Sequence, residues 1–241
     1  MVGQTESIHV VKTRNQRDIS IDCFYEAVDI LYQGWTREEH WGELNEWTNL
    51  QLVTTLGHEQ YLRISRIIIA GVSTDHMSAP WNEAAAAAAA AVEDEEDPEA
   101  LQSVSSQKTE TRVDYDIIYS PSYQVPVLYL TATPLSGTGP TSLAQIYDLL
   151  VPSQCRNQIE SMGVMGAVSM SEHPITGLPV FFVHPCRTAE AMAEVVQGRG
   201  DSLSPAEYLM MWLGLVGPSV GLSMPVELAK TMRSVCAARR E

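Results

Sequence analysis

Four short runs rich in β-branched and aromatic residues limit the folds that this chain can adopt. They cover residues 115–119, 123–131, 164–170 and 178–183. A Pro/Ser turn joins the first two runs, and a turn containing Pro and Gly joins the last two. Runs of this length separated by such turns are typical of β-hairpins. The sequence therefore predicts two antiparallel hairpins in a sheet of about four strands.

Helical patterns flank these strands. Residues 20–31 place apolar side chains on one helical face behind a capping serine. Ser204, Pro205 and Glu207 together have the pattern of a capped helix start, and Gly217 ends that helix. A sheet flanked by helices indicates an α+β fold, with the sheet covered on one face. The other predicted elements are helices at 143–150, 187–196 and 225–233, a short helix after Thr36, and a strand at 61–70.

Length and composition favour one domain with an insertion. A chain of 241 residues can bury a substantial core, and we expect a single domain over residues 1–241. From about residue 72 to residue 110 the composition changes, because an alanine run is followed by an acidic run at 93–99. A segment with so few large apolar residues cannot offset the entropy of being fixed in a core. We predict a flexible insertion there, and its acidity favours a role in solubility over a role in docking.

Charge and cysteine content restrict the class of protein. With 30 acidic and 15 basic side chains the net charge is −15, which argues against nucleic acid as the main partner. Four scattered cysteines, and an N-terminus without a signal-peptide pattern, favour a reducing cytoplasmic location. No stretch is long and apolar enough to span a membrane, and the histidines and cysteines lack zinc-ligand spacing. We expect no cofactor, no metal and no direct membrane insertion.

The tripeptide His184-Pro185-Cys186 carries the main chemical signal of the chain. It follows the apolar run at 178–183, and a proline there stops the strand and turns the chain outward. We therefore expect the cysteine at the surface, at the start of a helix and beside Arg187. The helix dipole and this cation both favour the reactive thiolate. The alternative interpretation is a structural cysteine at the end of a strand, which remains the default for Cys23 and Cys236.

His184 is the side chain nearest in sequence that can assist Cys186. An orienting or proton-transferring role and a purely structural role both stay open. In a cysteine hydrolase His184 would act as the general base, but Pro185 interrupts the strand on which the two side chains would point the same way. No residue that would orient such a base can be identified from the sequence. A hydrolase is therefore the weaker hypothesis.

Three separate motifs make the chain recognisable. They lie at residues 119–129, 172–188 and 212–222, and the second reads EHPITGLPVFFVHPCRT. With these motifs in the same order, roughly residues 112–230 closely resemble the autophagy-related protein 10 family of ubiquitin-like-conjugating enzymes. The first seventy residues match weakly, and the alanine-rich and acidic insertion is particular to this chain. The resemblance implies a ubiquitin-conjugating-enzyme-like fold.

The resemblance also implies a carrier reaction at Cys186. This cysteine would accept the C-terminal glycine of autophagy-related protein 12 from the activating enzyme, autophagy-related protein 7, as a thioester. The modifier would then pass to a lysine of autophagy-related protein 5, which supports autophagosome formation. Such an enzyme would be cytoplasmic and recruited to the pre-autophagosomal structure. A thiolate that attacks an activated thioester needs no strong permanent base.

The sequence departs from ordinary ubiquitin-conjugating enzymes at the oxyanion donor. Those enzymes carry a His-Pro-Asn motif before the cysteine, and the asparagine supplies an amide. Here Cys186 itself takes the third position of the tripeptide, where those enzymes have asparagine. The candidate donors to the oxyanion are therefore backbone N–H groups at the start of the following helix.

Two other functions of the same fold stay open. The sister family, autophagy-related protein 3, also has His-Pro-Cys but acts on a lipid-directed modifier. Arg187 and Thr188 after the cysteine, and an acidic first helix, favour protein conjugation instead. The second is a non-catalytic adaptor, in which an exposed edge strand at 62–69 and the acidic insertion would recruit partners.

Overall fold

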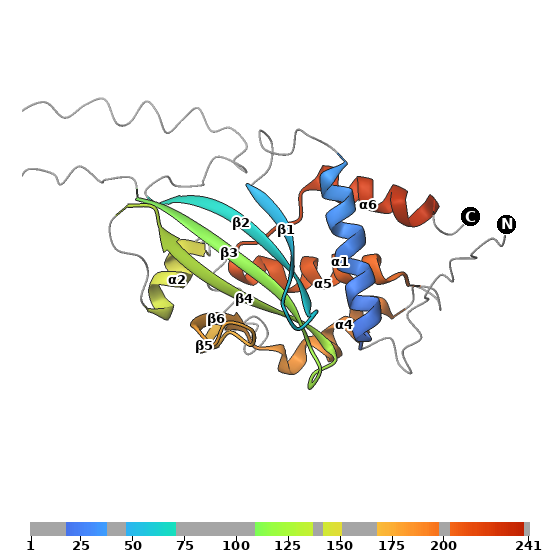
Figure 1. Cartoon of the computed structure of the whole chain (residues 1–241), viewed down its shortest axis with the longest axis horizontal. Helices are drawn as coiled ribbons and strands as arrows, with labels where there is room; N and C mark the ends of the chain where they lie inside the picture. The colour runs from blue at the N-terminus through green and yellow to red at the C-terminus, as the bar shows by residue number, and fades with distance from the viewer. Residues whose placement is uncertain are drawn as a thin grey trace, which may run out of the picture.

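The computed structural model describes residues 18–37, 47–70, 109–136, 142–150, 168–197 and 203–238 (Figure 1). The short helix expected after Thr36 falls mainly outside these ranges, as does the insertion up to residue 108. Residues 109 and 110, which the sequence assigned to the insertion, belong instead to a strand. The strands and helices confirm the α+β class.

An antiparallel sheet of six strands forms the centre of the structure, in the order β1-β2-β3-β4-β6-β5. Of the two strands beyond the expected four, β2 was predicted separately and β1 was not predicted. The signal for β1 is an alternation in which the apolar Leu50 and Leu52 flank the exposed Gln51. The strands are β1 (Asn49–Thr54), β2 (Gln60–Ala70), β3 (Thr109–Ser120), β4 (Val125–Pro134), β5 (Val168–Glu172) and β6 (Pro179–Val183).

The expectation that residues 62–69 form an exposed edge strand is wrong for residues 62–65, which lie between two strands. Strand β2 pairs with β1 over residues 60–65 and with β3 over residues 62–70. Leu62 and Ile64 are fully buried. Beyond Ser65 the described part of β2 pairs with β3 alone, and Ile67 and Ile69 are 46% and 43% exposed, so the first half of the run packs in the core and the second half does not. The outermost strands of the sheet are β1 and β5.

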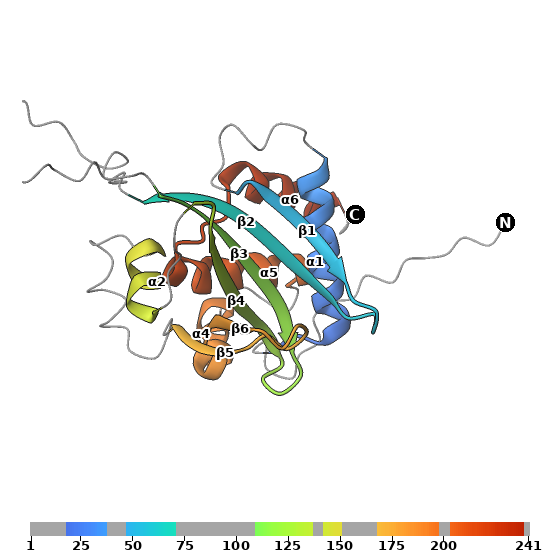
Figure 2. The ribbon, with the colours of Figure 1, turned by 60° about the vertical axis from the view of Figure 1, so that its left-hand side comes forward.

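The longest described helices lie on one face of the sheet (Figure 2). They are α1 (Ile21–Thr36), α5 (Pro205–Val216) and α6 (Val226–Ala238). The Ser20 hydroxyl caps α1 by accepting from the backbone N–H of Cys23, and Ser204 and Glu207 form the expected capping box of α5. The other helices in the described residues are α2 (Leu143–Leu150), α4 (Thr188–Val196) and the 3-10 helices η3 (Pro185–Arg187) and η4 (Gly217–Val220). No helix in the described ranges is long and apolar enough to cross a membrane.

The register of the sheet arranges side chains in crosswise rows that alternate between its two faces. One such row contains buried core residues: Ile64, Tyr115, Leu130 and Phe181. The neighbouring row lies on the opposite face, and we call it the outer row: Arg63, Asp116, Tyr129 and Phe182.

Candidate active site

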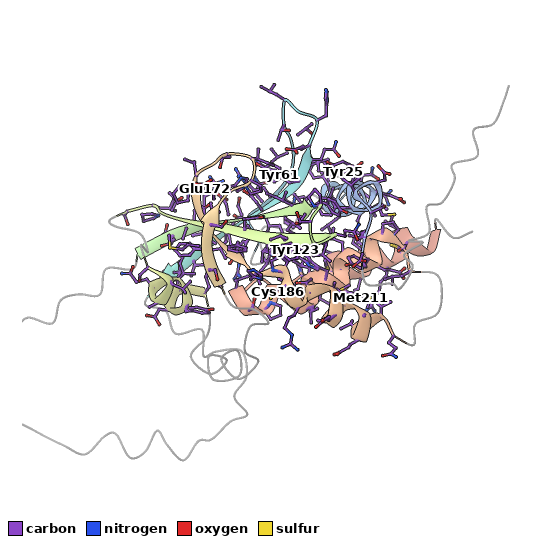
Figure 3. All side chains as sticks on the ribbon, turned by 90° about the horizontal axis from the view of Figure 1, so that it is seen from below. Tyr25, Tyr61, Tyr123, Glu172, Cys186 and Met211 are labelled. Carbon is purple, nitrogen blue, oxygen red and sulfur yellow. The ribbon has the colours of Figure 1, made fainter. Side chains whose placement is uncertain are left out.

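Cys186 lies where strand β6 passes into a helical segment. After β6 ends at Val183, His184 keeps an extended backbone (φ −66°, ψ 124°), and η3 then leads directly into α4. Pro185 is buried, whereas Cys186 is exposed and has a free thiol. The proline therefore anchors the turn and the thiol stays accessible (Figure 3).

The described cysteines differ in accessibility. Cys23 on α1 and Cys236 on α6 are free but buried. Cys155 lies outside the described residues. Among the cysteines that the structure places, Cys186 alone is exposed, so its thiol alone is accessible to a protein partner.

His184 holds the backbone of Cys186. Its Nδ1 accepts a hydrogen bond from the backbone N–H of Cys186, with 3.1 Å between the two nitrogens. His184 is thus the N-cap of η3. Because Nδ1 is the acceptor, the proton of the neutral ring is on Nε2. The sequence left an orienting and a proton-transferring role open, and this geometry supports the orienting role.

Aromatic rings surround His184 on the outer side of the sheet. The Tyr123 ring, at the turn between β3 and β4, meets the His184 ring edge-on at 6.0 Å between centroids. Phe182, two residues earlier on β6, lies 5.7 Å from it. Tyr129 on β4 stacks on Phe182 at 5.9 Å. Phe182 and His184 therefore lie on the same face of the sheet.

Charged and polar groups beside Cys186 already have partners within the chain. Arg187 Nε lies 3.9 Å from Glu190 Oε2, and both side chains are exposed, so this pair contributes little stability. The backbone N–H of Cys186 donates to His184, and that of Thr188 donates to the Pro185 carbonyl. Two of the predicted oxyanion donors are thus already hydrogen-bonded. Within the described ranges, no group of three His, Cys, Asp or Glu side chains is arranged to hold a metal ion.

A buried polar network lies on the same face of the sheet. Arg63 forms two hydrogen bonds to Asp116, from Nε to Oδ1 and from Nη2 to Oδ2, each 2.7 Å long. His173, in the turn between β5 and β6, places Nε2 3.1 Å from Asp116 Oδ2. Burial acts to raise the pKa of Asp116, but the hydrogen bonds from Arg63 and His173 outweigh it and hold the pKa below its usual value.

Sequence reasoning did not identify this network as part of the site. Its members come from three distant segments, since Asp116 is 53 residues from Arg63 and 57 from His173. The available signal was polar side chains at alternate positions of otherwise apolar strands. His173 entered the sequence analysis only as part of the motif at 172–188.

Comparisons with known proteins identify the family of the chain. The family described as "Autophagocytosis associated protein, active-site domain" matches residues 21–227. Three relatives are each named ubiquitin-like-conjugating enzyme ATG10. The Gibberella zeae protein is 37% identical over 134 residues, or 55% of this chain and 54% of the relative. The Homo sapiens protein is 35% identical over 134 residues, or 56% and 59%. The Arabidopsis thaliana protein is 30% identical over 184 residues, or 75% and 80%.

These matches differ in how much of each protein they cover. The chain spans little more than half the length of the fungal and human relatives, but 80% of the plant relative. The family match includes the sheet, η3 and Cys186. The chain therefore belongs to the ATG10 family of ubiquitin-like-conjugating enzymes of autophagy.

Proposed function

We propose that Cys186 carries a ubiquitin-like modifier as a thioester and passes it to a lysine of a protein acceptor. The observation that carries this proposal is the exposed thiol of Cys186 at the start of η3, with its backbone held by His184. A thiol in this position is accessible to a large protein donor, and the backbone that carries it is held in place. These are the properties that acyl transfer between proteins requires.

The chemistry has two transfers. The Cys186 thiolate attacks the carbonyl carbon of the modifier's thioester on the activating enzyme. The activating enzyme's thiolate then leaves, and a new thioester forms on Cys186. An uncharged lysine ε-amine next attacks the same carbonyl, Cys186 leaves as a thiolate, and an isopeptide bond forms. The amine loses its extra proton to solvent, so neither transfer consumes an oxidant or reductant.

The partners follow from the family. We propose autophagy-related protein 7 as the donor, autophagy-related protein 12 as the modifier and a lysine of autophagy-related protein 5 as the acceptor. The names of the relatives support a conjugating enzyme of autophagy. We also propose that the enzyme works in the cytoplasm and is recruited to the pre-autophagosomal structure.

His184 has a positioning role in this proposal. Its Nδ1 accepts from the backbone N–H of Cys186 and so holds the backbone that carries the thiol. To accept a proton at Nε2 the ring would have to change tautomer, and the hydrogen bond to Cys186 would be lost. The hydrogen bond therefore favours orientation over general base catalysis.

A reconstituted reaction tests this function. Purified chain, activating enzyme, modifier and ATP are combined without reductant, and products are followed on a gel with and without dithiothreitol. Wild type should give a thiol-sensitive adduct that disappears when the acceptor is added. Cys186→Ser should give an oxygen ester that resists dithiothreitol, and Cys186→Ala should give no adduct.

Cys23→Ala is the matched control, because it removes a buried thiol on α1. It should behave as wild type. A wild-type chain that binds the partners but forms no adduct would favour the non-catalytic adaptor instead.

A further inference from the structure

The hairpin of β5 and β6, which leads into Cys186, is paired with the rest of the sheet over few residues. Strand β6 pairs with β5 along its whole length, but β5 is the outermost strand. The register between β6 and β4 consists of two residue pairs, Tyr129 with Phe182 and Leu130 with Phe181. In contrast, β3 pairs with β4 over ten residues of each strand. Side-chain contacts must therefore contribute to the placement of β6.

His173 supplies such a contact between the hairpin and the sheet. It lies in the turn between β5 and β6 and is 3% exposed. Its Nε2 lies 3.1 Å from Oδ2 of Asp116 on β3, and two hydrogen bonds from Arg63 on β2 hold that carboxylate. A buried carboxylate with this many partners has a fixed position. His173 thus ties the hairpin to strands that lie two and three places away from β6.

The other ring nitrogen of His173 organises the turn itself. Nδ1 accepts from the backbone N–H groups of Ile175 and Thr176, at 3.2 Å each. These two donors leave Nδ1 without a proton, so Nε2 carries it and donates to Asp116. The two nitrogens therefore have separate tasks: Nδ1 shapes the turn, and Nε2 joins the turn to the sheet.

Packed rings connect His173 with His184. The Tyr129 ring contacts His173 at 5.6 Å and stacks on Phe182 at 5.9 Å. Phe182 in turn lies 5.7 Å from His184, which holds the backbone of Cys186. A displacement of the turn would shift this packing, because close-packed side chains transmit strain.

We propose that His173 is a positioning residue for Cys186 and acts through its Nε2 bond to Asp116. This inference rests on the proposed thioester function. Loss of the bond should move β6 relative to β4 and misplace the thiol when the activating enzyme presents its thioester. Misplacement of about 1 Å can lower a rate on the order of a hundredfold. Because the thiol is misplaced while the surface that binds the activating enzyme is kept, we expect a lower kcat and an unchanged KM for the loaded activating enzyme.

Two substitutions separate the tasks of the two nitrogens. In His173→Asn the amide oxygen takes the place of Nδ1, so the turn keeps its acceptor but the contact with Asp116 is lost. In His173→Gln the amide nitrogen takes the place of Nε2 and can still donate to Asp116. Loading of Cys186 should slow roughly tenfold or more in the Asn variant and stay within about threefold of wild type in the Gln variant. His58→Asn, at an exposed turn with positive φ, is the matched control.

The loading assay is run well below the unfolding temperature, with the fold of each variant checked by circular dichroism. The backbone amide signal of Cys186 is recorded by NMR as a readout independent of activity. It should shift in His173→Asn and remain near its wild-type position in His173→Gln. Wild-type loading and an unmoved Cys186 amide in folded His173→Asn would overturn the inference.

A milder variant keeps the test decisive if His173→Asn does not fold. Tyr129→Leu removes the ring between His173 and Phe182, and Tyr25→Leu on α1 is its control. Slower loading in Tyr129→Leu alone supports the inference, and equal loading in both variants contradicts it. Absence of any thioester on wild type would instead reject the proposed function, so the two failures are distinguishable.

Discussion

His184 and Cys186 are joined through the backbone rather than through the thiol: Nδ1 of the histidine accepts from the N–H of the cysteine at 3.1 Å. This bond caps η3, and it determines which ring nitrogen carries the proton. The histidine of the tripeptide is therefore part of the scaffold that presents the nucleophile.

Substitutions of His184 should separate capping from proton transfer. Asparagine can cap with its side-chain oxygen, so His184→Asn should keep most of the rate of thioester formation. His184→Ala loses the cap and should lower both that rate and the stability, the latter by about 1 kcal/mol. Single-turnover loading and thermal unfolding measure the two effects. If Asn is as slow as Ala while both are folded, His184 acts through Nε2.

Asp116 should make stability depend on pH in a defined direction. Its folded-state pKa lies below the usual value, so its stabilisation is present above about pH 4 and is lost as the pH falls through the folded-state pKa. At neutral pH Asp116→Asn should cost about 2–3 kcal/mol, because the partly buried Arg63 loses its counter-charge. Urea unfolding at pH 7, 5, 4 and 3 should show the gap to wild type closing below about pH 4. A gap of equal size at every pH contradicts the assignment.

Two glycines of the motif at 212–222 should respond in opposite directions to alanine. Gly221 has φ +66°, and a Cβ there would collide with the carbonyl oxygen of Leu150. Gly221→Ala should therefore destabilise the fold by more than about 1 kcal/mol. Gly214 lies within α5 on its exposed side, with open space around it. Gly214→Ala should therefore stabilise the fold by roughly 0.5–1 kcal/mol. Chemical unfolding of both variants checks this, and destabilisation by Gly214→Ala would contradict it.

Removal of residues 72–107 should leave thioester formation unchanged. The last residue of β2 and the first of β3, Ala70 and Thr109, are register partners, so a short Gly/Ser loop can join the strands. The sequence predicts that the alanine-rich and acidic segment between them serves solubility. Loading of Cys186 by the activating enzyme measures the effect. A large rise in KM would show that the segment docks a partner.

Much of the fold could be predicted because its signals are local. The caps at Ser20 and Ser204 and the turn between β3 and β4 each depend on neighbours in the sequence. The position of β2 could not be predicted in this way. An apolar run looks the same at a sheet edge and between two strands, and the difference depends on β1, whose short alternation was missed.

In the candidate site, too, the features that depend on sequence neighbours could be predicted and the others could not. The accessibility of Cys186 follows from Pro185 and the end of the strand, which are adjacent in sequence. The acceptor role of His184 depends on the rotation of its ring, and the contact between His173 and Asp116 depends on the placement of a hairpin turn over β3. Neither follows from spacing alone: the bond between His184 and Cys186 is local but needs one ring orientation, and the contact between His173 and Asp116 joins segments 57 residues apart.

Mapping of the loaded residue identifies the nucleophile of the chain. The chain is loaded in single turnover, digested under non-reducing acidic conditions and analysed by mass spectrometry, with Cys186→Ala in parallel. We expect the C-terminal glycine of the modifier on Cys186, where hydroxylamine should release it, and no adduct on the alanine variant. A thioester on another cysteine, or an adduct that persists in Cys186→Ala, would rule out Cys186 as the nucleophile.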